Sequence, residues 1–144
     1  MAKLENIPTR GPAGIAALLL LLVLCLGCSQ RDRAGLRARS GDADAQFEYG
    51  LLLESTQPRQ AIGWLEKAAE QGHRDAALEL IQVHLGERRL PPDPAQATRW
   101  YQRAADLDHV ESQLTLARRF AQGIGTPVNH GRAAEFFAAA ADAG

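Results

Sequence analysis

Four histidines are the side chains of this chain best suited to bind a metal ion or to act as a general base. They are His73, His84, His109 and His130, and no two of them are four residues apart. Zinc sites on a helix use that spacing because it places two ligands on one face. We therefore expect neither a histidine metal site nor a bound cofactor.

Serine nucleophiles and phosphate-binding glycines are the next candidates for chemistry. Ser40, Ser55 and Ser112 are not surrounded by Gly-x-Ser-x-Gly, which is the usual setting of a hydrolase nucleophile. Gly123 and Gly125 form a Gly-x-Gly pair, but no predicted strand precedes it, as a phosphate-binding loop would require. The sequence therefore predicts a protein that is not an enzyme.

Both cysteines of the chain lie at the end of an apolar leader. The run from Ala13 to Leu26 is almost unbroken and follows a basic start with Lys3 and Arg10. A membrane-spanning helix needs about 20 apolar residues, more than this run contains, so the run is typical of a signal peptide. With only Cys25 and Cys28 present, no disulfide is available to the rest of the chain.

The end of the leader, Cys25-Leu26-Gly27-Cys28, resembles a bacterial lipobox. Gly27 matches the small residue of that motif and Cys28 the acylated cysteine, whereas Cys25 replaces the usual aliphatic residue. The resemblance implies a lipoprotein signal peptide over residues 1–27. Ser29, which is not Asp, implies a lipid anchor on the periplasmic face of the outer membrane. An ordinary signal peptide cut near Gly27 and an uncleaved membrane anchor are the alternatives.

The segment after the leader has the composition of a linker. From Ser29 to Asp44 the only large apolar residue is Leu36, and no hydrophobic period is found. We therefore expect residues 28–43 to be an acylated cysteine followed by a flexible tether. Its arginines would either lie against anionic headgroups or be solvated.

A nine-residue pattern occurs three times, at residues 61–69, 97–105 and 133–141, with a period of 36 residues. In each copy the apolar residues fall at i, i+3, i+4, i+7 and i+8, which is one face of an amphipathic helix. Ala97, Trp100 and Tyr101 begin that face in the middle copy. The pattern predicts an all-α repeat domain over residues 44–144.

Extending the alignment predicts six helices and three repeats. Asp93 and Asn129 are expected N-caps, and Gly72 and Asp108 are expected to end helices in a left-handed conformation. Matched residues of the first and second copies are separated by less than the 36-residue period, because a loop in the first copy is shorter. The expected repeats cover about 44–71, 72–107 and 108–144, and the expected helices about 44–54, 58–71, 74–86, 94–107, 110–122 and 130–143.

These repeats resemble the Sel1-like repeat. The resemblance is carried by Ala-x-x-x-Tyr-Gly at residues 45–50, by Phe-x-x-Gly-x-Gly at 120–125, and by the run from Asn129 to Gly144. It implies a right-handed helix-pair solenoid related to tetratricopeptide repeats, which are the alternative family. The second copy departs from the pattern, because Glu87 and Arg89 stand where the third has its loop glycines. A cysteine-rich branch linked to penicillin hydrolysis does not match, because this chain has no cysteine after Cys28.

The candidate contact residues are those that differ between copies on the first helix of each repeat, which lines the concave side in solenoids of this kind. They are Glu48, Leu51, Glu79, Gln82, Thr115 and Arg118. A basic rim of Arg88, Arg89, Arg118 and Arg119 is a weaker candidate. A solvated face is the alternative for each of these residues.

The last predicted helix is rich in alanine and has few charges, so we expect its outer side to bind a partner through Ala134 and Ala138. A second copy of the chain is the alternative partner. The formal net charge is −1, which gives no footprint for nucleic acid. By resemblance, the chain is expected to be an envelope adaptor that holds another protein. A periplasmic enzyme or enzyme subunit acting on cell-wall material is the alternative.

Overall fold

The computed structural model describes residues 30–88 and 90–143, and in these ranges all regular secondary structure is helical. The leader, Cys28, Arg89 and Gly144 lie outside the described residues. The labelled helices are α2 (Ala43–Leu53), α3 (Pro58–Glu70), α4 (Arg74–Leu85), α5 (Pro94–Ala105), α6 (Val110–Gln122) and α7 (His130–Ala143). Each coincides closely with one of the six predicted helices.

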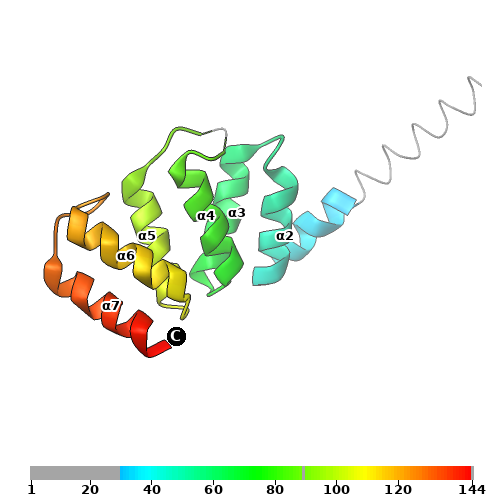
Figure 1. Ribbon diagram of the computed structural model, residues 1–144. Helices are drawn as coiled ribbons and strands as arrows, with labels where there is room; N and C mark the ends of the chain where they lie inside the picture. Colours follow the sequence, from blue (N-terminus) through cyan, green and yellow to red (C-terminus); the bar gives the residue numbers. More distant parts are fainter. Residues whose placement is uncertain (1–29, 89, 144) are drawn as a thin grey trace, which may run out of the picture.

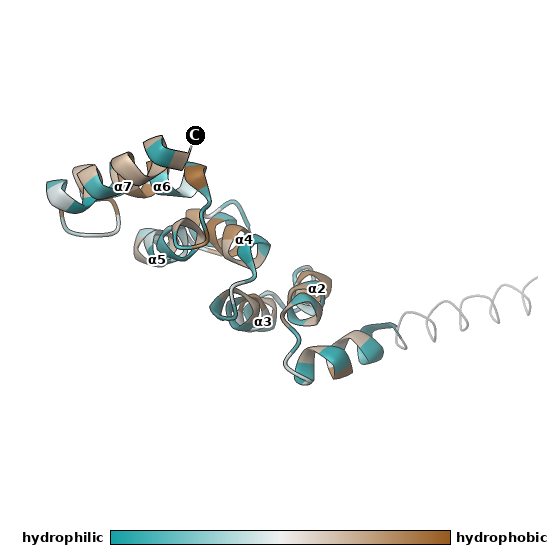
Figure 2. Ribbon diagram, turned by 90° about the horizontal axis from the view of Figure 1, so that it is seen from below, coloured by the Kyte–Doolittle hydropathy of each residue, from teal (hydrophilic) through white to brown (hydrophobic). Residues whose placement is uncertain are grey.

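The labelled helices form three stacked pairs, α2 with α3, α4 with α5, and α6 with α7 (Figure 1). Successive pairs are joined by contacts of α3 with α4 and of α5 with α6. Seen from below, the pairs are staggered along one axis (Figure 2). The predicted helix-pair solenoid is therefore confirmed.

The ends of the helices are set by the predicted caps. The Asp93 carboxylate accepts hydrogen bonds from the backbone N–H groups of Ala95 and Gln96, and the Asn129 side chain accepts one from Arg132 N–H. Gly72 and Asp108 have φ of 93° and 58°, as expected for left-handed residues that close a helix.

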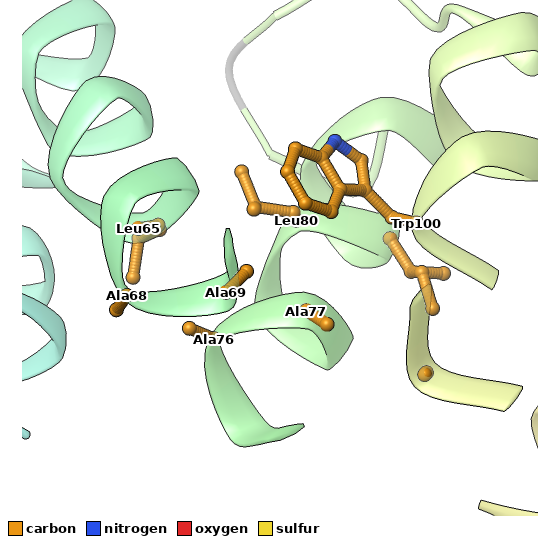
Figure 3. Packing of buried hydrophobic residues seen from close by; sticks show 9 residues of the cluster. Leu65, Ala68, Ala69, Ala76, Ala77, Leu80 and Trp100 are labelled. Carbon is orange, nitrogen blue, oxygen red and sulfur yellow. The ribbon is translucent and has the colours of Figure 1, made fainter. Parts of the chain in front are cut away.

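Alanines let the helices approach closely around one large aromatic side chain. Trp100 is 1% exposed and packs in a cluster with Leu65 and Leu80, while Ala69 and Ala76 lie between α3 and α4 in the same cluster (Figure 3). Small residues at such a crossing bring the backbones together, and the aromatic ring fills the wider part of the junction. This cluster binds the first repeat to the second.

The prediction that the segment before α2 is a flexible tether is wrong for residues 30–39. These residues form a helix that packs on α2. Ala38 is fully buried, and its carbonyl accepts a hydrogen bond from the Gln46 side chain at 3.2 Å. A Cβ placed on Gly35 would lie 3.1 Å from the Tyr49 ring, so a larger side chain here would require that ring to move by a few tenths of an ångström. The segment contains few large apolar residues, but small side chains are sufficient for close helix packing.

This N-terminal helix occupies the place of the second helix of a preceding repeat. Gly41 follows it with φ of 95°, as Gly72 follows α3 with φ of 93°. Asp42 then caps α2 by accepting from Ala45 N–H, as His73 caps α4 by accepting from Ala76 N–H. The spacing of Gly41 and Gly72 equals that of the other matched columns in the first two copies, so extending the pattern by one more helix would have found it.

Within the described part of the chain, no helix combines the length and the apolar character needed to cross a membrane.

Candidate functional site

Three of the six predicted contact residues lie around the ends of α2 and α4. Leu51 is 38% exposed and lines a cleft, Glu79 pairs with Arg88 beside the cleft, and Gln82 faces Glu87. The packing of α2 and α4 around α3 brings them to one place, although Leu51 and Gln82 belong to different repeats.

The other three predicted contact residues are separate from that cleft. Glu48 is exposed on α2 and forms a 3.9 Å ion pair with Arg37 of the N-terminal helix. Arg118 is exposed on α6, and Thr115 is partly buried on the same helix. The structure therefore divides the predicted set between one cleft and two more open surfaces.

The cleft has a volume of about 590 Å³ and lies where α2 ends, α3 begins and α4 runs into its following loop. Its surface is mainly aliphatic, with charged side chains at the rim. The lining residues are Leu51, Glu54, Ser55, Pro58, Ala61, Ile62, Leu65, Val83, Glu87, Arg88 and Leu90.

Arg88 is held at the rim by two carboxylates. Its guanidinium nitrogens lie 2.8 Å from Glu54 Oε1 and 2.7 Å from Glu79 Oε2. Both carboxylate side chains are 29% exposed, so the pairs are partly screened by water. Arg88 is therefore engaged within the protein and does not contribute to a free basic rim.

Arg119, a second member of the predicted basic rim, is buried at 7% exposure. Its Nε donates to Thr98 Oγ1 at 2.8 Å, and its Nη2 donates to the Pro94 carbonyl at 2.8 Å. The guanidinium lies 5.2 Å from the centre of the Tyr101 ring. Burial lowers the pKa of Arg119 and raises the pKa of the Tyr101 phenol. The predicted basic rim of Arg88, Arg89, Arg118 and Arg119 is therefore wrong, because Arg119 is buried and hydrogen-bonded within the protein.

The loop that contains the glycines of the third copy packs closely against the start of α5, beside Arg119. A Cβ on Gly125 would lie 2.0 Å from the Pro94 carbonyl oxygen, so only glycine allows the loop to approach α5 in this way. The neighbouring Ile124 carbonyl accepts a hydrogen bond from Thr98 Oγ1 at 3.0 Å. The Gly-x-Gly pair therefore has a packing role here.

The outer side of α7 carries the remaining predicted contact residues. Ala134 and Ala138 are both exposed, and Phe137 beside them is 41% exposed. The opposite side of the helix is packed, with Ala133 buried and Phe136 stacked on Phe120 at 5.9 Å between ring centres. The exposed side thus carries Ala134, Phe137 and Ala138 with the exposed Glu135 and Asp142 at its edge, while the helix itself packs against α6.

The histidines at the repeat turns take structural positions. The Nδ1 atoms of His73 and His109 accept hydrogen bonds from the N–H groups of Ala76 and Ser112, each at 3.2 Å. Among residues 30–88 and 90–143, no three His, Cys, Asp or Glu side chains are grouped so that they could hold a metal ion.

Comparison with known proteins agrees with this architecture. The family model described as Sel1 repeat matches residues 43–73, 83–109 and 110–144. A Sel1 repeat protein from Oxalobacter formigenes is 31% identical, with a TM-score of 0.62, over 78% of this chain and 88% of the other. A search of curated proteins finds no match.

Two further solved structures have similar folds. One, a protective antigen present in uropathogenic Escherichia coli strains, displays an SLR fold; it is 30% identical with a TM-score of 0.61, over 78% of this chain and 25% of that chain. The other, cysteine rich protein B of Helicobacter pylori, is 19% identical with a TM-score of 0.54, over 80% of this chain and 89% of that chain. The second likeness concerns the fold alone.

Proposed function

Because this chain belongs to the Sel1 repeat family, we propose that it is a lipid-anchored adaptor that holds another protein in the bacterial cell envelope. Repeats of this family are generally protein-interaction modules. The envelope location rests on the sequence of the leader, in which Gly27 and Cys28 match the small residue and the acylated cysteine of a lipobox. Lipid chains on Cys28 would keep the repeat domain close to the membrane surface.

The observation that carries the adaptor function is the exposed apolar side of α7. Phe137 is 41% exposed between the exposed Ala134 and Ala138. A large exposed aromatic side chain near exposed alanines offers apolar surface for a partner to cover, with the exposed Glu135 and Asp142 at its edge. The occupant we propose is another envelope protein.

The adaptor function is tested by placing charges on this surface. The double substitution Ala134→Glu and Ala138→Glu should lower recovery of the partner in pull-downs from solubilised envelopes by roughly tenfold or more, because two carboxylates would be buried at the interface. Helicity and melting temperature should remain near those of the unmodified chain, since both positions are exposed.

A matched control adds the same charge elsewhere. Ala95→Glu with Gln122→Glu changes two other exposed positions, and partner recovery should be unaffected. Equal recovery with both double variants would exclude the α7 surface as the docking site. Failure to recover any stoichiometric partner with the unmodified chain would count against an adaptor.

The anchor is tested separately at Cys28. Cys28→Ala should abolish incorporation of labelled palmitate and leave the chain unprocessed or released from the membrane fraction. Cys25→Ala serves as the control, because the resemblance to a lipobox places the acylated cysteine at Cys28. Palmitate labelling that persists in Cys28→Ala would refute the lipid anchor.

A further inference from the structure

The loops after α4 and α6, each of which borders a junction between repeats, are closed in the same way. Asp93 N–H donates to the His84 carbonyl at 2.8 Å, and Asn129 N–H donates to the Phe120 carbonyl at 2.8 Å. Both residues of the second bond stand one repeat period after those of the first. The two closing bonds therefore span equal lengths of chain, whereas the helix ends differ, because the left-handed glycine after α6, Gly123, stands one position later in the repeat than Gly86 after α4.

At the second junction, an arginine fills the space between the end of α6 and the start of α5. The Arg119 side chain crosses to Thr98 and the Pro94 carbonyl, and the loop around Gly125 closes over that end of α5. This arrangement shows that the junction accommodates an arginine side chain, with its head group bonded to neutral oxygen atoms.

At the first junction, the equivalent residues are smaller or less polar. Val83 stands one repeat period before Arg119, and Ile62 stands one period before Thr98. Valine has neither the length nor the donors to span the same distance. The cleft of about 590 Å³ lies at this place and is lined by Val83, Ile62 and Pro58.

The lining of the cleft suits a guest side chain that has an aliphatic stem and a positive head. Leu51, Ile62 and Val83 supply apolar surface for the stem. Two carboxylates, Glu54 and Glu87, lie at the rim with a single described cation, Arg88. Arg88 is already paired with Glu54 and Glu79, so Glu87 is the rim carboxylate that has no ion pair among the described residues.

We propose that this cleft binds an arginine side chain presented by an extended segment of a partner protein, in the space that Arg119 fills at the second junction. The inference rests on the proposed adaptor function and adds the chemistry of one partner segment. The stem packs on Ile62 and Val83, and the guanidinium lies toward the Glu87 carboxylate at the rim. The α7 surface and this cleft are then two separate contacts of the adaptor.

The test is a titration of the full chain, labelled with nitrogen-15, with the hexapeptide acetyl-Ser-Gly-Ile-Arg-Gly-Ser-amide. Amide signals of Ile62, Leu65 and Val83 should shift in a saturable manner. Peptides with Leu or Glu in place of Arg should bind about twofold to fivefold more weakly, because they lack the partly screened ion pair.

Two variants locate the binding. Val83→Arg supplies the side chain found at the second junction, so it should fill the cleft and abolish the shifts while the melting temperature is retained. Glu87→Gln removes one rim charge without changing the shape and should weaken binding by about twofold to fivefold. Arg118→Ala, at an exposed position on α6, is the control and should bind like the unmodified chain.

Each other outcome overturns the proposal. Equal binding of the Leu peptide would show a general aliphatic site, and shifts that persist in Val83→Arg would place the peptide elsewhere. Absence of any shift would exclude peptide binding at the cleft. Concentration-dependent self-association that the arginine peptide competes away would identify a second copy as the occupant. Because the titration uses no natural partner, its failure leaves the α7 pull-down result intact, and the converse also holds.

Discussion

At the scale of single residues, the left-handed backbone conformation at each repeat turn favours glycine over residues with a side chain. Gly41, Gly72 and Asp108 occupy equivalent turns and all have positive φ. Asp108 is the only described non-glycine residue with positive φ. A Cβ in this conformation is crowded by the backbone, and aspartate tolerates it better than most residues but less well than glycine.

The substitution Asp108→Gly should therefore stabilise the protein. We expect a gain of about 1 kcal/mol, which corresponds to a melting temperature about 4 to 8 °C higher for a domain of this size. The reverse exchange at the equivalent turn, Gly72→Asp, should lower the melting temperature. Space is not limiting there, since the nearest atom to an added Cβ is 3.8 Å away. Thermal unfolding followed by circular dichroism checks both, and a loss of stability in Asp108→Gly would contradict the strain argument.

At the scale of elements, the helix of residues 30–39 closes one end of the stack. Gln46 is 5% exposed and connects this helix to the first repeat, donating to the Ala38 carbonyl and accepting from Gln71 at 2.7 Å. Gln113 makes the equivalent bond to the Ala105 carbonyl at 3.3 Å between α5 and α6. The same glutamine contact therefore joins a second helix to the next first helix at both places.

The substitution Gln46→Ala should loosen the N-terminal helix selectively. Removing the amide takes away one of the two hydrogen bonds that the Ala38 carbonyl accepts, the other coming from Gly41 N–H, at a cost of about 0.5 to 1.5 kcal/mol. Amide hydrogen exchange should become faster over residues 30–39 and change little in α5 to α7. Gln113→Ala is the matched control and should accelerate exchange around α5 and α6 while leaving residues 30–39 protected. Uniform acceleration in both variants would show that the helix has no separate stability.

At the scale of the whole molecule, stability depends on the stacking of neighbours around the middle repeat. Trp100 is 1% exposed, whereas Trp64 and Phe136, the equivalent residues of the outer repeats, are only partly buried. Trp64 lies edge-on to Tyr49 and under Lys67, nearer to water. The middle aromatic side chain thus packs with Leu65 of the first repeat and Leu80 of its own repeat, which couples two neighbours in the stack.

The substitution Trp100→Ala should therefore be the most damaging of the three. Removing a fully buried aromatic side chain costs about 3 to 5 kcal/mol, a large share of the roughly 5 to 15 kcal/mol of a typical domain. Trp64→Ala and Phe136→Ala should each cost less. Urea unfolding followed by circular dichroism measures the three midpoints, and equal losses at all three positions would argue against a coupled stack.

Local sequence was sufficient to predict α2 to α7 and their ends. The spacing of apolar residues, the N-caps Asp93 and Asn129 and the left-handed turn at Gly72 are properties of a few consecutive residues. Helix periodicity and capping act over one or two turns, so they can be recognised without a neighbour. The outer side of α7 was predictable for the same reason, and Ala134 and Ala138 are exposed as expected.

Only the tertiary structure decided how neighbouring side chains are used. Arg118 and Arg119 are adjacent in the sequence, yet Arg118 is exposed while Arg119 is buried against Pro94 and Thr98. Likewise, residues 30–39 become a packed helix because α2 presents Gln46 and Tyr49 to them. The cleft beside Val83 also arises from residues of three helices. Burial depends on the register between helices, which is set by packing across the stack and is not written in any one segment.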